Sequence, residues 1–240
     1  MRFFCLALLF VFGGPSFAQS PYHFNLARES AWVGGSGAVL GLSFGIQANL
    51  KPFTSAQLAG LDPSRVPALD RYSLRHFSLQ AQHGSDWVLY STMVLPAVLL
   101  IDPAIRSHAG ETALLIGETF MVVTALTQVT KNLVRRPRPF TYNPNAPPDL
   151  KLKRDARLSF FSGHTSTVAA MTFATATVWS DYHPNSRWKP AVWTGAAAIP
   201  ATVAFLRMKG GKHFLTDVLV GYGVGAAIGW LVPKAHRLSE

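Results

Sequence analysis

Long apolar stretches separated by short charged ones dominate the chain. As helices, five of these stretches would extend roughly 22 to 30 Å, which approaches the roughly 30 Å hydrocarbon core of a bilayer. They lack the alternation of a half-buried strand and exceed the usual strand length. The pattern therefore predicts an all-α, membrane-embedded helical bundle. The five segments are Trp87–Ile101, Glu111–Thr130, Thr165–Trp179, Pro190–Leu206 and Phe214–Val232.

A sixth segment, Ala31–Leu50, is apolar but rich in glycine, so the predicted bundle has five to six transmembrane helices. The last apolar segment carries Gly221, Gly225 and Gly229 at four-residue intervals. Such a stripe allows another helix to approach closely in a membrane, and we interpret it as a packing surface. The polar stretch over residues 50–86, interrupted by prolines, predicts a surface loop with a short helix and no recognisable chemistry.

The amino-terminal residues are typical of a secretory signal peptide. Arg2 is a short positive region, an apolar run follows it, and residues 16–18 form a small-x-small cleavage site. We therefore predict cleavage after Ala18 and a mature chain that begins at Gln19. Cys5 is the chain's single cysteine and lies in this segment, so the mature chain would hold no disulfide, catalytic thiol or cysteine-based zinc site. An uncleaved first membrane helix is the alternative.

The basic character of the chain narrows its partners. The formal net charge is +10 although only 14% of the residues are charged. This balance favours anionic partners: nucleic acid, an anionic membrane surface or a phosphate-bearing substrate. Nucleic acid is disfavoured because no basic helix and no aromatic-basic pattern occurs outside the apolar framework. Membrane lipids and a phosphate-bearing substrate are therefore the predicted partners.

Three charged stretches are predicted to meet at one face of the bundle. Residues 131–139 follow one apolar segment, and residues 162–164 immediately precede the next. Arg207 ends the segment after that, and His213 begins the last one. Two antiparallel crossings therefore return Arg207 and His213 to the side where the first two stretches already lie.

The residues at that face suit a phosphate group. Ser162 and Gly163 stand at a predicted helix start, where free backbone N–H groups and the helix dipole favour an anion. Gly163 also lets the backbone approach a ligand closely. Lys131, Arg138 and Arg207 supply three cations, and the two guanidiniums are suited to forked contacts with phosphate oxygens. A helix cap at Ser162 and a lipid-headgroup role for Lys131 and Arg138 are the simpler alternatives.

Two histidines at the same face provide nucleophilic and acid–base chemistry. His213 and Asp217 are four residues apart and share a helical face, so the carboxylate can hold the imidazole tautomer. With His164 close by, one ring can attack while the other transfers protons. A carboxylate inside an apolar segment, as at Asp217, usually has a function. The other six histidines are interpreted as solvated or capping: His23, His76, His83, His108, His183 and His236.

At these residues the sequence resembles the phosphatidic acid phosphatase type 2 (PAP2) and vanadium haloperoxidase superfamily. The family pattern is Lys, six residues, Arg-Pro; then Pro-Ser-Gly-His; then Ser-Arg, five residues, His, three residues, Asp. Lys131 and Arg138 keep the first spacing, and Arg207, His213 and Asp217 keep the third. Three ordered motifs with these spacings are a specific signature.

The resemblance has two departures and covers about half of the chain. Phe161 replaces the family proline before Ser162, and Leu206 replaces the serine before Arg207. Neither change removes a charged or proton-transferring group, although the hydroxyl missing at Leu206 would weaken phosphate binding a little. The predicted organisation is a signal peptide over 1–18, amino-terminal helices and a polar loop over 19–108, a PAP2-type core over 109–233 and a short tail over 234–240.

The resemblance implies a site that needs no metal and no cofactor. His213 would attack phosphorus and form a phosphohistidine, supported by Asp217, and His164 would protonate the leaving oxygen and later activate water. The implied function is hydrolysis of a lipid phosphate monoester or diphosphate by a bacterial membrane phosphatase. The phosphate oxygens would be held by Lys131, Arg138, Ser162, Gly163 and Arg207.

Other functions remain open at this stage. A vanadate-dependent haloperoxidase shares the motifs, although such enzymes resemble larger soluble proteins. A soluble secreted acid phosphatase shares them too, but the near-continuous apolar segments disfavour it. A non-enzymatic lipid- or phosphate-binding protein would not need the histidine pair. The sequence does not choose among phosphatidic acid, phosphatidylglycerophosphate, undecaprenyl diphosphate and lipid A as substrates, and it does not set the oligomeric state.

The expected location is the bacterial inner membrane, as a multi-pass protein whose active site faces the exterior. This orientation follows from the resemblance to bacterial members if the Gly-rich segment over residues 31–50 is only interfacial. If that segment spans the bilayer and the signal is cleaved, counting the crossings places the site in the cytoplasm instead. The bias of basic loops does not decide between the two, because the most basic loop is the site itself.

Overall fold

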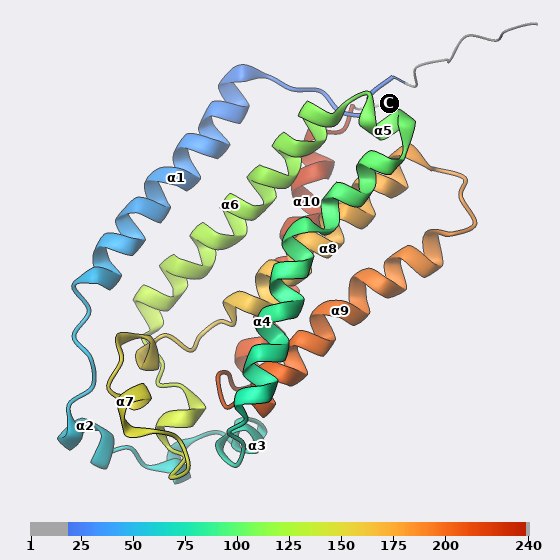
Figure 1. The fold of residues 1–240 in the computed structure, drawn as a ribbon. Helices are drawn as coiled ribbons and strands as arrows, with labels where there is room; N and C mark the ends of the chain where they lie inside the picture. The colour runs from blue at the N-terminus through green and yellow to red at the C-terminus, as the bar shows by residue number, and fades with distance from the viewer. Residues whose placement is uncertain (1–18, 239–240) are drawn as a thin grey trace, which may run out of the picture.

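The computed structural model describes residues 19–238, so the predicted signal peptide and its cleavage site lie outside the described residues. Six long helices run side by side along one axis, with short helices and loops at their ends (Figure 1). In the described range no strand forms, and Tyr22 and Arg237 make only an isolated bridge. The all-α prediction is confirmed. The long helices are α1 (Leu26–Ala48), α4 (Leu79–Val94), α6 (Ala109–Val134), α8 (Gly163–Tyr182), α9 (Lys189–Lys209) and α10 (Leu215–His236).

Each of the five predicted apolar segments lies in helical structure, and the Gly-rich sixth forms α1. The segment over 87–101 differs from its prediction, because α4 ends at Val94 and a 3-10 helix, Leu95–Ile101, continues it. Pro96 explains the change, since its ring cannot donate the N–H that an α-helix needs there. By contrast, Pro200 stays inside α9.

Four segments of the described chain are long and apolar enough to cross a membrane: Leu79–Ile101, Ala109–Thr141, Lys189–Lys209 and Leu215–His236. The predicted crossing over 165–179 is not among them, although α8 is a full-length helix. Its residues include many threonines and alanines, and most of them are buried among the other helices. A helix that is surrounded by protein does not need to be as apolar as a helix that faces lipid. This explains why the mean hydropathy of α8 is lower than that of the four candidate spans.

The glycine stripe packs α10 against α8, as predicted. A Cβ atom at Gly221 would lie only 2.7 Å from the carbonyl oxygen of Ser162. At Gly225 and Gly229 it would lie closer still to backbone oxygens of α8. The two helices therefore touch backbone to backbone along their length, which only glycine permits.

Two polar connections cover the end of the bundle at which α6 and α9 finish. The first joins α1 to α4, and the second joins α6 to α8 (Figure 1). Both are built from short helices, in line with the loop predicted over 50–86. These are α2 (Ser55–Ala59), α3 (Arg71–Leu74), α7 (Pro148–Lys151) and the 3-10 helices Pro63–Arg65, Ala68–Asp70, Pro139–Thr141 and Arg154–Arg157; at the other end, α5 (Pro103–Arg106) precedes α6.

Candidate active site

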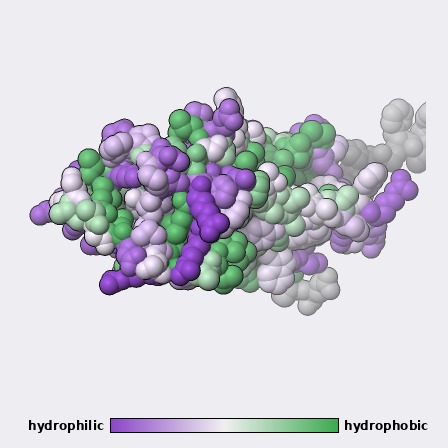
Figure 2. All heavy atoms as spheres, turned by 90° about the horizontal axis from the view of Figure 1, so that it is seen from below, coloured by the Kyte–Doolittle hydropathy of each residue, from purple (hydrophilic) through white to green (hydrophobic). Residues whose placement is uncertain are grey.

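The three charged stretches meet in one pocket of about 630 Å³ at this polar end of the bundle. Figure 2 shows the molecule from that end, where hydrophilic residues gather among apolar ones. Two of the eight predicted site residues, Ser162 and Asp217, lie behind the pocket wall rather than in it. The six that line the pocket are Lys131, Arg138, Gly163, His164, Arg207 and His213.

The floor of the pocket is the amino end of α8. A Cβ atom at Gly163 would lie 3.5 Å from Nζ of Lys131 and 3.4 Å from a methyl carbon of Thr127. Glycine therefore leaves the α8 amide groups and the Lys131 ammonium open to a common ligand. An anion at this point would meet both the positive end of the helix dipole and a cation.

Arg138 is held rigidly at the centre of the site and is only 3% exposed. Its guanidinium donates to the carbonyl oxygen of Lys212 at 2.9 Å and to Oδ1 of Asp155 at 2.7 Å. A third contact, at 3.0 Å, joins Nη1 of Arg138 to Nε2 of His213. Burial and the neighbouring Arg138 charge lower the pKa of Lys212 to about 8. This crowding of positive charge favours an anionic ligand.

The contact with Arg138 indicates the tautomer of His213. A guanidinium can only donate, so Nε2 must accept and the neutral ring carries its proton on Nδ1. Nδ1 lies 3.6 Å from Oδ2 of Asp217, which is too long for a hydrogen bond but correctly directed. Burial, followed by the charges of Arg138 and Arg207, holds the pKa of His213 well below its ordinary value. His213 therefore presents a neutral ring with its lone pair toward the pocket.

Asp217 is anchored by other groups than the predicted histidine. Its carboxylate accepts hydrogen bonds from the Ser159 hydroxyl at 2.5 Å, Arg136 at 2.6 Å and the Phe214 amide at 2.9 Å. Arg136 also pairs with Asp70 at 2.7 Å. Asp217 thus caps the start of α10 and fixes the position of His213, while the direct bond between the two side chains is not formed.

His164 and Arg207 share one carboxylate. Oδ1 of Asp86 lies 2.7 Å from Nε2 of His164 and 3.1 Å from Nη1 of Arg207. A single carboxylate oxygen of Asp86 therefore bridges the predicted proton donor and a predicted phosphate ligand.

Gly211, at φ +67°, makes the turn between α9 and α10 that brings His213 back beside Arg207.

The Ser162 hydroxyl serves the helix start rather than the pocket. It accepts from the Thr165 amide at 3.3 Å and lies 2.9 Å from the Thr165 hydroxyl. The Ser162 amide donates to the carbonyl oxygen of Asp217 at 3.0 Å. The structure therefore assigns Ser162 the simpler of its two interpretations, that of an N-cap.

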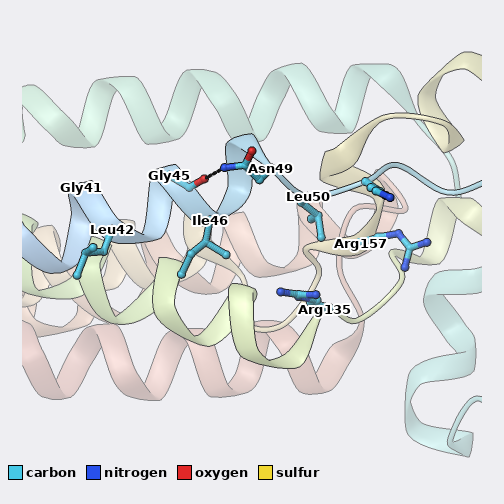
Figure 3. A pocket seen from close by; sticks show the side chains of 9 residues that line it. Gly41, Leu42, Gly45, Ile46, Asn49, Leu50, Arg135 and Arg157 are labelled. Atoms are coloured by element: carbon cyan, nitrogen blue, oxygen red, sulfur yellow. Dashed lines mark hydrogen bonds between the residues drawn. The ribbon is translucent and has the colours of Figure 1, made fainter.

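A larger groove of about 770 Å³ opens nearby, between the end of α1 and Arg135. Figure 3 shows Arg135 and Arg157 beside the apolar side chains of Ile46 and Leu50. In the described chain this groove is lined by cations but by no histidine or carboxylate, so it lacks groups that can attack or transfer a proton. The chemistry belongs to the smaller pocket.

Several site residues were missed by sequence reasoning. The polar stretch over 50–86 was expected to carry no chemistry, which is wrong, because it supplies Asp70 and Asp86. His83 also lines the pocket instead of facing solvent alone. The sequence offered a signal for Arg136 as a site residue, because it lies within the first motif. For Asp86 the one available signal was its position immediately before an apolar segment.

The charges of the pocket are matched to a dianion. Lys131, Arg138, Arg207 and Lys212 bring four cations, and Asp86 and Asp155 bring two carboxylates. These six side chains carry a formal net charge of +2. This sum complements a phosphate monoester.

Comparison with known proteins agrees with this geometry. The family model described as the PAP2 superfamily matches residues 112–239. Among solved structures, the chain is similar to a transmembrane PAP2-type phosphatidylglycerolphosphate phosphatase from Bacillus subtilis, with a TM-score of 0.52, 20% identity, and coverage of 83% of this chain and 94% of that chain. No curated protein sequence matches the chain. The chain thus shares the fold of that structure, the family match spans more than half of the sequence, and the chain belongs to the PAP2 superfamily.

Proposed function

We propose that this protein is a phosphatase that hydrolyses a lipid phosphate monoester or diphosphate through a phosphohistidine, without a catalytic metal ion. The observation that carries the proposal is the pocket in which His213 directs a lone pair into a cluster of four cations. These cations supply the charge stabilisation for which many phosphatases use a metal.

The reaction follows from the positions of the two histidines. Nε2 of His213 attacks phosphorus, so an N–P bond forms as the P–O bond to the alcohol breaks. A bound phosphate dianion would favour the doubly protonated ring of His164, whose Nε2 proton stays in the hydrogen bond to Asp86 while its Nδ1 proton passes to the leaving oxygen. Nδ1 then takes a proton from water, which attacks phosphorus and frees His213. Arg138, now 3.0 Å from Nε2 of His213, would shift its N–H onto a phosphate oxygen. If the 3.6 Å separation from Asp217 closed, its carboxylate would accept a hydrogen bond from Nδ1 of the phosphorylated His213 ring.

The wall of the pocket supports a lipid as the substrate. Beyond the charged floor, the lining continues along α4 and α6 with Leu89, Tyr90, Met93 and Phe120. Tyr90 is 63% exposed and Phe120 is 38% exposed. A head group at His213 would thus leave its hydrocarbon chain against apolar side chains on two candidate membrane spans. A water-soluble phosphate ester without a hydrocarbon chain would gain no binding free energy from these apolar side chains.

Activity of the purified protein in detergent tests this function. We expect phosphate release from lipid phosphates to survive EDTA and to be inhibited by orthovanadate, which mimics pentacoordinate phosphorus. Because apolar contacts hold the chain, kcat/KM for long-chain phosphatidic acid should exceed that for a short-chain analogue by roughly tenfold or more. The His213→Ala variant is the inactive control.

Two results would contradict the proposal. Loss of activity on chelation followed by recovery with magnesium would show a catalytic metal. Halide oxidation with added vanadate, in the absence of phosphate release, would favour the haloperoxidase alternative.

We assign Asp86 the role of a positioning residue for His164. Its carboxylate accepts the Nε2 proton of His164 at 2.7 Å and so keeps the ring oriented and protonated at this atom. The Asp86 carboxylate also contacts Arg207, and a bound phosphate would compete with it for that guanidinium. On substrate binding, Arg207 would therefore move its hydrogen bond from Asp86 to the phosphate, while Asp86 would keep its hydrogen bond to His164.

The Asp86→Asn variant separates positioning from binding. The amide keeps the size but loses the charge, so we expect kcat to fall by roughly 10- to 100-fold, less than the 10²- to 10⁴-fold usual for loss of a general acid. KM should stay unchanged or decrease, because a competing anion has been removed. Asp62→Asn, at an exposed carboxylate in the connection between α1 and α4, is the matched control. A lower KM with unchanged kcat would show that Asp86 only competes with substrate.

We further propose that the protein is a bacterial inner-membrane protein whose active site faces the exterior, as the resemblance to bacterial members implies. The orientation depends on α1, which runs beside α6 and ends at the polar end that holds the site (Figure 1). If the amino end is exported and α1 crosses the bilayer, the site lies in the cytoplasm. An exterior site and cleavage after Ala18 are therefore compatible only if α1 does not cross from outside.

Single cysteines decide the orientation. In a Cys5→Ser background the chain has no other cysteine, so Ser64→Cys marks the polar end and Asn185→Cys marks the opposite end. For an exterior site, a membrane-impermeant maleimide added to intact cells labels position 64 and not position 185. Labelling of position 185 alone would place the site in the cytoplasm.

A further inference from the structure

Three ionisable side chains meet at the end of the bundle opposite the active site. Glu29 lies in the first turn of α1, Glu118 lies in α6 and His236 ends α10. The start of α1, the first half of α6 and the end of α10 all lie in the upper part of Figure 1. One ligand atom from each residue lies within 4.8 Å of the others, and all three side chains are buried. About 20 Å of α6 separates Glu118 from Lys131, so the cluster is distinct from the phosphatase pocket.

His236, expected to be solvated or capping, is not solvated, although its contact with a carbonyl in the last turn of α10 fits the capping alternative. Its ring is fully buried, and Nδ1 lies 2.8 Å from the carbonyl oxygen of Val232. A carbonyl only accepts, so Nδ1 carries a proton. Nε2 therefore faces the two carboxylates, at 2.8 Å from Oε2 of Glu29 and 3.0 Å from Oε2 of Glu118. In the neutral ring, all three facing atoms present lone pairs to one another.

Glu118 is the least satisfied member of the cluster. Neither of its carboxylate oxygens has a hydrogen-bond partner, although both are buried. Even a second proton, on Nε2 of His236, would point at Glu29 and would not serve Glu118. A buried carboxylate without hydrogen bonds is costly and calls for a positive ligand.

We propose that Glu29, Glu118 and His236 bind a divalent transition-metal ion of the zinc class. Zinc lies about 2.0–2.2 Å from imidazole nitrogen and carboxylate oxygen, which places neighbouring ligand atoms of a tetrahedral site about 3.4 Å apart. The observed separations from Nε2, 2.8 and 3.0 Å, are shorter than this, so the ion would enter after small outward shifts of the two carboxylates. The nitrogen ligand favours zinc over magnesium or calcium, which prefer oxygen.

The surroundings hold the ligands as a metal site requires. The bond from His236 to the Val232 carbonyl fixes the ring with Nε2 inward, which is the usual second contact of a metal-binding histidine. The other oxygen of Glu29 accepts from the Asn25 amide at 2.8 Å and from Arg28 at 2.9 Å. Bound metal would tie the start of α1 and the end of α10 to the first half of α6. It would stabilise the fold and take no part in phosphate chemistry.

Metal content of the purified protein tests the site. The protein is prepared in detergent without a polyhistidine tag, exposed to zinc chloride, desalted and analysed by mass spectrometry for metals. We expect roughly one zinc per chain in the wild type, and a loss of most of it in Glu118→Gln, which keeps the shape but removes the ligand charge. Glu111→Gln, on the same helix but outside the cluster, is the matched control and should retain the zinc.

Thermal unfolding provides a second measurement. Added zinc should raise the unfolding midpoint of the wild type and of Glu111→Gln but not that of Glu118→Gln. Phosphatase activity of Glu118→Gln should stay near the wild-type value, which keeps a failure of this site distinguishable from a failure of the proposed reaction. A wild type that binds no zinc, or equal zinc in wild type and Glu118→Gln, would overturn the proposal and leave a proton-sharing cluster instead.

Discussion

The backbone contact between α8 and α10 is the constraint on which the rest of the site depends. His164 stands in the first turn of α8, and His213 immediately precedes α10, so the distance between the two rings is set by how closely the helices approach. Gly221 meets the carbonyl of Ser162 at that very end, and the Ser162 amide donates to the carbonyl of Asp217. Side chains on the stripe would push the two histidines apart.

Buried ion pairs hold the polar connection that covers the bundle against the start of α10. Arg136 lies between Asp70 and Asp217, and both carboxylates are almost fully buried. Loss of a partner in such an arrangement usually costs about 3–5 kcal/mol, because an uncompensated charge stays behind. The loop that carries Asp70 is therefore locked to the start of α10. Through Asp217 this lock extends to His213, which connects the polar cover of the bundle to the reacting group.

Sequence alone predicted the fold class and the meeting of the three motifs, because both follow from local patterns: apolar length and the parity of helix crossings. It did not find Asp70 or Asp86, because their positions depend on how the connection after α1 folds back over the bundle. The same limit explains His236, which is buried because α1, α6 and α10, distant from one another in sequence, meet around it. Spacing correctly placed Asp217 on the face of His213 but did not reveal that Arg136, Ser159 and the Phe214 amide occupy its oxygens.

Detection of the covalent intermediate is the most direct test of His213 as the nucleophile. Rapid quenching with a ³²P-labelled lipid phosphate, followed by peptide mapping, reports which residue carries the phosphoryl group. We expect an acid-labile label on the peptide that contains His213, present in wild type and absent in His213→Ala. Label that persists in His213→Ala but disappears in His164→Ala would contradict this expectation and reverse the roles of the two histidines.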